Sequence, residues 1–194
     1  MSEMSRDKLK YTEIRQNRRN TKNGLKSRKN EINSGKTEIN REEKIVIKVL
    51  FICHGNICRS TMAQSILQHM VEERGIASDY YIDSAATSRE EIGNGVHYGT
   101  VRKLNEVGIP VVPHRARQMT ANDYREFDYL IGMDSANIRN MTRIAGGDPS
   151  GKIYKLLEFS GKSRDVADPW YTGDFDATYR DVCEGLNAFI NQIS

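Results

Sequence analysis

The chain has 194 residues, with 29 Lys and Arg against 26 Asp and Glu, and the charge is unevenly placed. Residues 1–44 carry 13 basic and 7 acidic side chains, whereas residues 45–194 carry 16 and 19. The sequence has no apolar run near the roughly 18 residues that a membrane span needs, and we see no apolar leader at its start. The three cysteines are an odd number, which argues against a disulfide framework. We therefore expect a cytoplasmic protein whose folded part is not a basic nucleic-acid-binding domain.

Residues 1–44 are predicted to be a disordered basic extension. They include only eight hydrophobic residues, too few to offset the entropy of ordering a chain. The alternative is a basic arm that contacts an acidic surface, nucleic acid or anionic lipid, although a single aromatic residue, Tyr11, argues against stacking on bases. Residues 45–194 have the length and composition of one domain.

From residue 45 onward, expected strands alternate with expected helices. Strands are expected at 45–52, 80–85, 127–133 and 152–156. Helices are expected at 60–74, at 96–107, from the capping residue Asp134 to about Ile144, and at 175–190. The first strand is a nearly continuous apolar run, as in a strand covered on both faces. The alternation predicts an α/β three-layer sandwich with a central parallel sheet of about four strands.

The loop between the first strand and the first helix has the form Cys53-x5-Arg59-Ser60. Gly55 permits backbone conformations that other residues resist, so that successive amides can point inward toward an anion at the helix N-terminus. Arg59 can hold two phosphate oxygens with its planar fork, and the same positive field favours a thiolate at Cys53. A lone cysteine would be interpreted as a small buried hydrophobe. Its place between a buried strand and a helix instead predicts a nucleophilic phosphate-binding loop.

Residues 49–60 (VLFICHGNICRS) resemble the signature of the low-molecular-weight protein tyrosine phosphatases. The likeness spans about residues 46–192 and includes motifs at 83–88, 115–118, 127–129, 133–134 and 168–171. It implies hydrolysis of phosphotyrosine through a phosphocysteine intermediate, without cofactor or metal. Cys53 would be the nucleophile, Arg59 the phosphate clamp and Asp168 the general acid and base. The implied phosphate-binding residues are His54, Gly55, Asn56, Ile57, Cys58, Arg59 and Ser60. The implied partners are phosphotyrosine-containing proteins, among them a bacterial tyrosine kinase or its targets.

A specificity wall is expected around this loop. Trp170 and Tyr171 follow Asp168 and are expected to deepen the pocket, so that phosphotyrosine reaches Cys53 and phosphoserine does not. The alternatives are that residues 168–169 only begin a turn and that Trp170 packs in a core. Glu90 stands where many relatives carry an aromatic residue, which predicts an acidic rim that favours basic or neutral substrates.

Supporting residues are also implied by the resemblance. Ser84, His114 and Asp134 are expected to brace the loop by hydrogen bonds, and a general-base role for His114 is the alternative. Cys58 either traps oxidised Cys53 in a reversible disulfide or packs beneath the loop.

Three other functions compete with the tyrosine phosphatase. An arsenate reductase of the same fold would pass a disulfide along further cysteines, but none lies between Cys58 and Cys183. A phosphoarginine phosphatase tends to have threonine at the position of Ile57. A non-catalytic phosphate-binding module would need neither the nucleophile nor the acid, and both are present.

Overall fold

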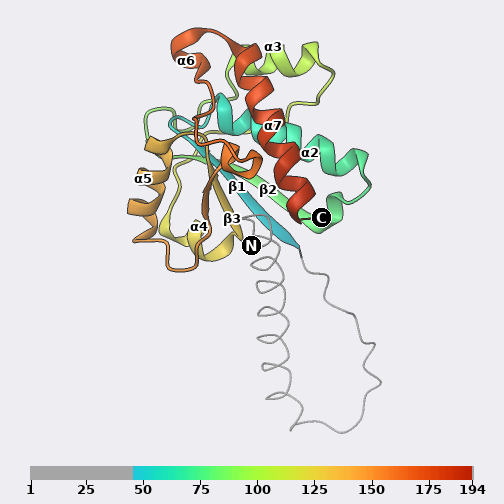
Figure 1. The fold of residues 1–194 in the computed structure, drawn as a ribbon. Coiled ribbons are helices and arrows are strands. Elements are labelled where there is room, and N and C mark those ends of the chain that lie inside the picture. Colours follow the sequence, from blue (N-terminus) through green and yellow to red (C-terminus); the bar gives the residue numbers. More distant parts are fainter. Residues whose placement is uncertain (1–45, 194) are drawn as a thin grey trace, which may run out of the picture. The chain divides into compact units, whose positions relative to one another are not determined.

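Strand β1 (Ile47–Cys53) lies inside a parallel sheet in the computed structural model, which describes residues 46–193 (Figure 1). The strand order is β2-β1-β3-β4, with β2 at Tyr80–Ala86, β3 at Tyr129–Gly132 and β4 at Ile153–Lys155. All three strand pairs are parallel. Since the chain order reverses beside β1, a ligand crevice is expected outside the carboxyl end of this strand, where Cys53 lies. The prediction for residues 1–44 falls outside the described residues.

Helices cover both faces of the sheet. The α-helices are α2 (Arg59–Glu73), α3 (Tyr98–Glu106), α4 (Ala121–Glu126), α5 (Ser135–Ala145), α6 (Pro169–Thr172) and α7 (Phe175–Ile193). Short 3-10 helices also lie at η1 (Ala77–Asp79) and η2 (Leu156–Ser160). Helix α2 packs against β1 and β2, and α5 packs against β3 and β4. Figure 1 shows α2, α3 and α7 on one side of the sheet and α4 and α5 on the other. The predicted three-layer α/β architecture is confirmed.

The expected elements are found with small shifts at their ends, whereas α4 and α6 were not predicted. Helix α4 has six residues, and only Asp123 and Tyr124 are buried in it, so it shows no apolar periodicity. Helix α6 has four residues and begins at Pro169 after the capping residue Asp168. Asp134 caps α5 as predicted, because its carboxylate accepts a hydrogen bond from the backbone N–H of Asn137 at 2.6 Å.

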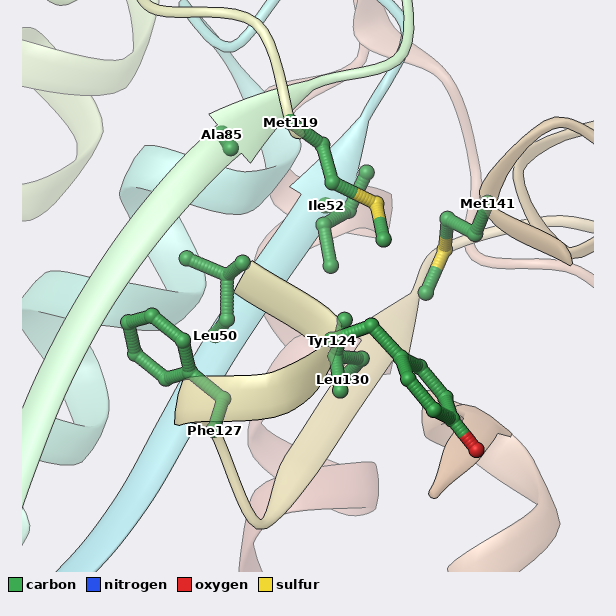
Figure 2. Packing of buried hydrophobic residues seen from close by; sticks show 8 residues of the cluster. All are labelled: Leu50, Ile52, Ala85, Met119, Tyr124, Phe127, Leu130 and Met141. Carbon is green, nitrogen blue, oxygen red and sulfur yellow. The ribbon is translucent and has the colours of Figure 1, made fainter. Parts of the chain in front are cut away.

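Strand β1 is buried on both of its faces. Leu50 and Ile52 point toward the α4 and α5 side, while Val49 and Phe51 point the other way, and all four side chains are fully buried. Figure 2 shows the cluster around the first pair, which consists of Leu50, Ile52, Ala85, Met119, Tyr124, Phe127, Leu130 and Met141. This packing explains the continuous apolar run and holds the strand that ends at Cys53. Among residues 46–193, no helix is both long and apolar enough to cross a bilayer.

Candidate active site

A pocket of about 140 Å³ opens at the carboxyl end of β1. Cys53 is the last residue of the strand and pairs in register with Ala86 of β2. The following loop leads directly into α2, whose first residue is Arg59. The residues that line the pocket are Cys53, His54, Gly55, Ile57, Cys58, Arg59, Glu90, Glu91, Asp168, Trp170 and Tyr171. The pocket therefore brings together the three residues expected to carry the chemistry.

Asn56 holds the shape of the loop from within. It is completely buried and has a φ of 60°, in the left-handed region that Asn tolerates better than most residues. Its Nδ2 donates to Ser60 Oγ at 3.0 Å and to Ser84 Oγ at 2.9 Å. Its Oδ1 accepts from His114 Nε2 at 2.7 Å and from the backbone N–H of Arg117 at 3.1 Å. All four hydrogen-bonding positions of this amide are thus occupied.

Gly55 does not have the conformational role expected of it, because the positive φ falls on Asn56. Its lack of a side chain serves a close approach instead. A Cβ on Gly55 would lie 3.0 Å from Cγ of Glu91, so the glycine lets Glu91 pack directly over the loop.

The sulfur of Cys53 lies at the base of this network and is 3% exposed as a residue. Ser60 Oγ lies 3.1 Å from it, and the backbone N–H of Asn56 donates to it at 3.3 Å. Since Asn56 Nδ2 already donates to Ser60 Oγ, the hydroxyl proton of Ser60 can point to the sulfur. Two donors therefore stabilise negative charge on this atom.

Arg59 is a buried cation held between two carboxylates. Its NH1 lies 2.7 Å from Asp134 Oδ2, and its NH2 lies 2.7 Å from Asp168 Oδ2. Burial by itself would lower the pKa of Arg59, but the negative charges of Cys53, Asp168 and Asp134 outweigh it and raise that pKa. The guanidinium is therefore charged and fixed in direction, with further N–H donors for phosphate oxygens.

Asp168 combines a local structural role with a place in the pocket. It caps α6, because its Oδ1 accepts from the backbone N–H of Trp170 at 3.1 Å, and Pro169 occupies the first helical position. Residues 168–169 therefore begin a short helix and not only a turn. The other carboxylate oxygen lies against Arg59, inside the pocket.

The side chains at the pocket mouth are aromatic and acidic. Trp170 is 61% exposed and Tyr171 85% exposed, so Trp170 is not the core residue of the alternative interpretation. Glu90 accepts a hydrogen bond from His54 Nε2 at 3.0 Å. Glu91 also lines the pocket, and sequence reasoning singled out only its neighbour Glu90.

The supporting residues occupy different positions. His114 contacts Asn56, and its Nδ1 lies 4.0 Å from Asp83 Oδ1, while the ring is not among the groups that line the pocket. Burial lowers the pKa of His114, an effect that nearby Arg117 reinforces and Asp83 opposes. Ser84 Oγ donates to Gln64 Oε1 at 2.7 Å and so links the loop to α2.

Cys58 lines the pocket as the last residue of the loop before α2. It is buried, and burial raises its pKa to about 12, with further contributions from the negative charges of Cys53 and Asp168. Cys58 is therefore a protonated thiol at neutral pH, and its redox role stays a prediction. Among residues 46–193 no group of three or more His, Cys, Asp or Glu side chains is placed to hold a metal ion.

Comparisons with known proteins agree with this geometry. Residues 48–194 match the model of the low molecular weight phosphotyrosine protein phosphatase family. The low molecular weight protein-tyrosine-phosphatase YfkJ of Bacillus subtilis is 37% identical over 150 residues, covering 76% of this chain and 94% of YfkJ. The YfkJ crystal structure superposes with a TM-score of 0.74 and 36% identity, covering 78% of this chain and 96% of YfkJ.

Two further solved structures are similar. The low molecular weight protein tyrosine phosphatase SP-PTP of Streptococcus pyogenes has a TM-score of 0.69 and 37% identity, with 77% of this chain and 94% of that one covered. The Drosophila arginine phosphatase DARP has a TM-score of 0.69 and 32% identity, and the match covers 75% of this chain and 96% of DARP. The resemblance recognised in the sequence is confirmed, and the chain belongs to the low molecular weight phosphotyrosine protein phosphatase family.

Proposed function

We propose that the chain is a protein tyrosine phosphatase that hydrolyses phosphotyrosine through a phosphocysteine intermediate. The observation that carries the proposal is the convergence of Cys53, Arg59 and Asp168 on one pocket. The named activities of YfkJ and SP-PTP support it. Cys53 is the nucleophile, Arg59 the phosphate clamp and Asp168 the general acid and base.

In the first step, the thiolate of Cys53 attacks phosphorus and the bond between phosphorus and the tyrosyl oxygen breaks. Protonated Asp168 donates its proton to the leaving phenolate, which departs as neutral tyrosine. Arg59 and the loop amides from His54 to Ser60 hold the phosphoryl oxygens. The hydroxyl of Ser60 donates to the sulfur before attack, which keeps the thiolate in place.

In the second step, the carboxylate of Asp168 accepts a proton from water as the water oxygen attacks phosphorus. The S–P bond breaks, inorganic phosphate leaves, and the thiolate of Cys53 is restored. Asp168 is thereby protonated again for the next cycle, so protons and electron pairs balance over both steps.

The pocket lining favours an aryl phosphate over the alternatives. Trp170, Tyr171 and Ile57 line the pocket, which supports a role for the two aromatic rings in flanking a substrate ring. Phosphoarginine is the second candidate substrate, because the similar structure DARP is named an arginine phosphatase. The arsenate reductase alternative requires a cysteine relay, and Cys183, on α7, does not line the pocket.

The test is a parallel assay of three peptides that differ only in carrying phosphotyrosine, phosphoarginine or phosphoserine. We expect hydrolysis of the phosphotyrosine peptide, loss of that activity in Cys53→Ser, and full activity in the matched control Cys183→Ser. Preference for phosphoarginine would change the substrate class. Inactivity on all three would favour a non-catalytic phosphate-binding module.

The proposed activity suggests which proteins the chain acts on and which part of the chain is needed for catalysis. A tyrosine kinase or its phosphorylated targets are the proposed protein partners, and the cytoplasm is the proposed compartment. We also propose that residues 45–194 suffice for catalysis. Removal of residues 1–44 should therefore leave kcat/KM for an aryl phosphate within about twofold, because the family match begins at residue 48 and Cys53, Arg59 and Asp168 all follow it.

A further inference from the structure

His97 connects three parts of the active site that are far apart in the sequence. Its backbone N–H donates to the carbonyl of Ile57, in the phosphate-binding loop, at 2.8 Å. Its ring Nδ1 accepts from the backbone N–H of Gly99 at 3.1 Å and so caps α3. These two bonds fix the backbone and the ring of His97 relative to the loop.

The imidazole ring packs against the segment that follows Asp168. It stacks on Phe175, the first residue of α7, with centroids 5.5 Å apart and ring planes 8° apart. It meets Trp170 edge-on, with centroids 6.1 Å apart and an interplanar angle of 70°. Both arrangements are those that aromatic rings favour.

Gly99 shows how close this packing is. A Cβ on Gly99 would lie 2.3 Å from two carbons of the Phe175 ring, so only glycine at this position lets α3 approach Phe175. Close contact between the start of α3 and the start of α7 is therefore built into the sequence.

The segment that bears Asp168 is fixed at two points. At Ala167, the backbone N–H donates to Asp181 Oδ2 at 2.9 Å, and the carbonyl accepts from Thr178 Oγ1 at 2.9 Å. The second point is the packing of Trp170 and Phe175 on His97. Asp168 lies between these points and faces Arg59.

We propose that His97 is a positioning residue, whose ring sets the place of Asp168 and Trp170 relative to the phosphate-binding loop. The inference rests on the proposed role of Asp168 as the general acid. His97 touches neither the phosphate nor the reacting sulfur in this scheme. It acts by holding the proton donor at the correct distance from the leaving oxygen.

Two substitutions of His97 separate the effect of its ring packing from the effect of its capping hydrogen bond to Gly99. His97→Asn keeps a side-chain acceptor for the N–H of Gly99 but removes the ring, while His97→Phe keeps a ring but removes the acceptor. Each is compared on phenyl phosphate, whose leaving group needs a proton, and on para-nitrophenyl phosphate, whose leaving group hardly needs one.

For His97→Asn we expect kcat/KM to fall about tenfold on phenyl phosphate and less than about twofold on para-nitrophenyl phosphate, because only the first depends on a well-placed acid. His97→Phe should keep the wild-type ratio between the substrates. Inhibition by inorganic phosphate should be unchanged in both variants, because the loop itself is intact.

A spectroscopic measurement tests the packing independently of activity. Trp170 is the only tryptophan of the chain, so fluorescence excited selectively at tryptophan reports on this position alone. Its emission maximum and its quenching by acrylamide should change in His97→Asn and stay close to wild type in His97→Phe. Thr120→Ala, at the cap of α4, is the control for losing a helix cap outside the pocket.

The outcomes are distinguishable. If Asp168→Ala slows both substrates equally, the proposed general acid is wrong. If Asp168→Ala separates the substrates and His97→Asn does not, or if Trp170 emission is unchanged in His97→Asn, the His97 proposal is wrong and the proposed function stands.

Discussion

The guanidinium of Arg59 and the carboxylate of Asp168 lie 2.7 Å apart, so the proposed phosphate clamp and the proposed proton donor form one ion pair. Asp134 occupies the other side of the same guanidinium at 2.7 Å. Because α5 begins just after Asp134 and α6 just after Asp168, the direction of Arg59 is set by two helix starts. The orientation of the clamp thus depends on elements outside its own loop.

Replacing Arg59 with lysine should lower kcat/KM for an aryl phosphate by about 100-fold or more. Lysine keeps the charge but lacks the planar fork that serves two carboxylates and the phosphate together. Steady-state kinetics and the inhibition constant of inorganic phosphate would measure the loss. Arg143→Lys, on the exposed side of α5, is the matched control and should behave as wild type. Near-normal activity of Arg59→Lys would contradict the clamp role.

Two substitutions of Asn56 should separate the stability contributed by the hydrogen bonds of its amide from the cost of its left-handed backbone conformation. Asn56→Ala loses the four side-chain hydrogen bonds and keeps a left-handed backbone, which should lower the free energy of unfolding by about 2–4 kcal/mol. Asn56→Gly loses the same bonds without the backbone strain and should be about 1 kcal/mol more stable than Asn56→Ala. Urea unfolding measures both. Equal stability of the two variants would mean that the left-handed conformation carries no cost.

The pH dependence of stability should reveal His114. Its pKa is lowered in the folded protein, so the unfolded chain takes up a proton first as the pH falls through about 6.5. The free energy of unfolding should therefore decrease below that pH, by at most about 1.4 kcal/mol per pH unit from this residue, until the folded-state pKa is passed. His114→Gln should show a shallower dependence in denaturation series between pH 5 and 8. An identical dependence in the two proteins would contradict this assignment.

The acidic pocket mouth should influence the choice of peptide. Glu90 and Glu91 both line the pocket, and neutralising them in the double variant Glu90→Gln/Glu91→Gln should raise kcat/KM by about tenfold for phosphotyrosine peptides flanked by acidic residues. Peptides flanked by lysine should gain nothing or lose activity. The difference in kcat/KM between the double variant and the wild type should shrink as the salt concentration rises, since these side chains are partly exposed. Glu126→Gln, on α4, is the control, and an unchanged peptide preference in the double variant would argue against the rim.

The part of the candidate site that holds Cys53 and Arg59 was predictable because it lies in one continuous stretch of sequence. The apolar run of β1, the loop and the start of α2 are adjacent in the sequence, so local pattern alone places Cys53 and Arg59 at a strand-to-helix junction. The α/β class follows from the alternation of strands and helices. The short helices α4 and α6 were not predictable in this way, because six or four residues show no periodicity.

The sequence by itself determined the strand-loop-helix segment that bears Cys53 and Arg59, and the alternation of strands and helices determined the class of fold. Only the tertiary structure assigned the left-handed conformation to Asn56 rather than Gly55, because its amide is satisfied by partners from β2 and the region of His114. Only the tertiary structure brought Glu91 over Gly55 and the ring of His97 against Trp170. These contacts join segments that are distant along the chain. They exist because the parallel sheet collects the carboxyl ends of its strands at one edge.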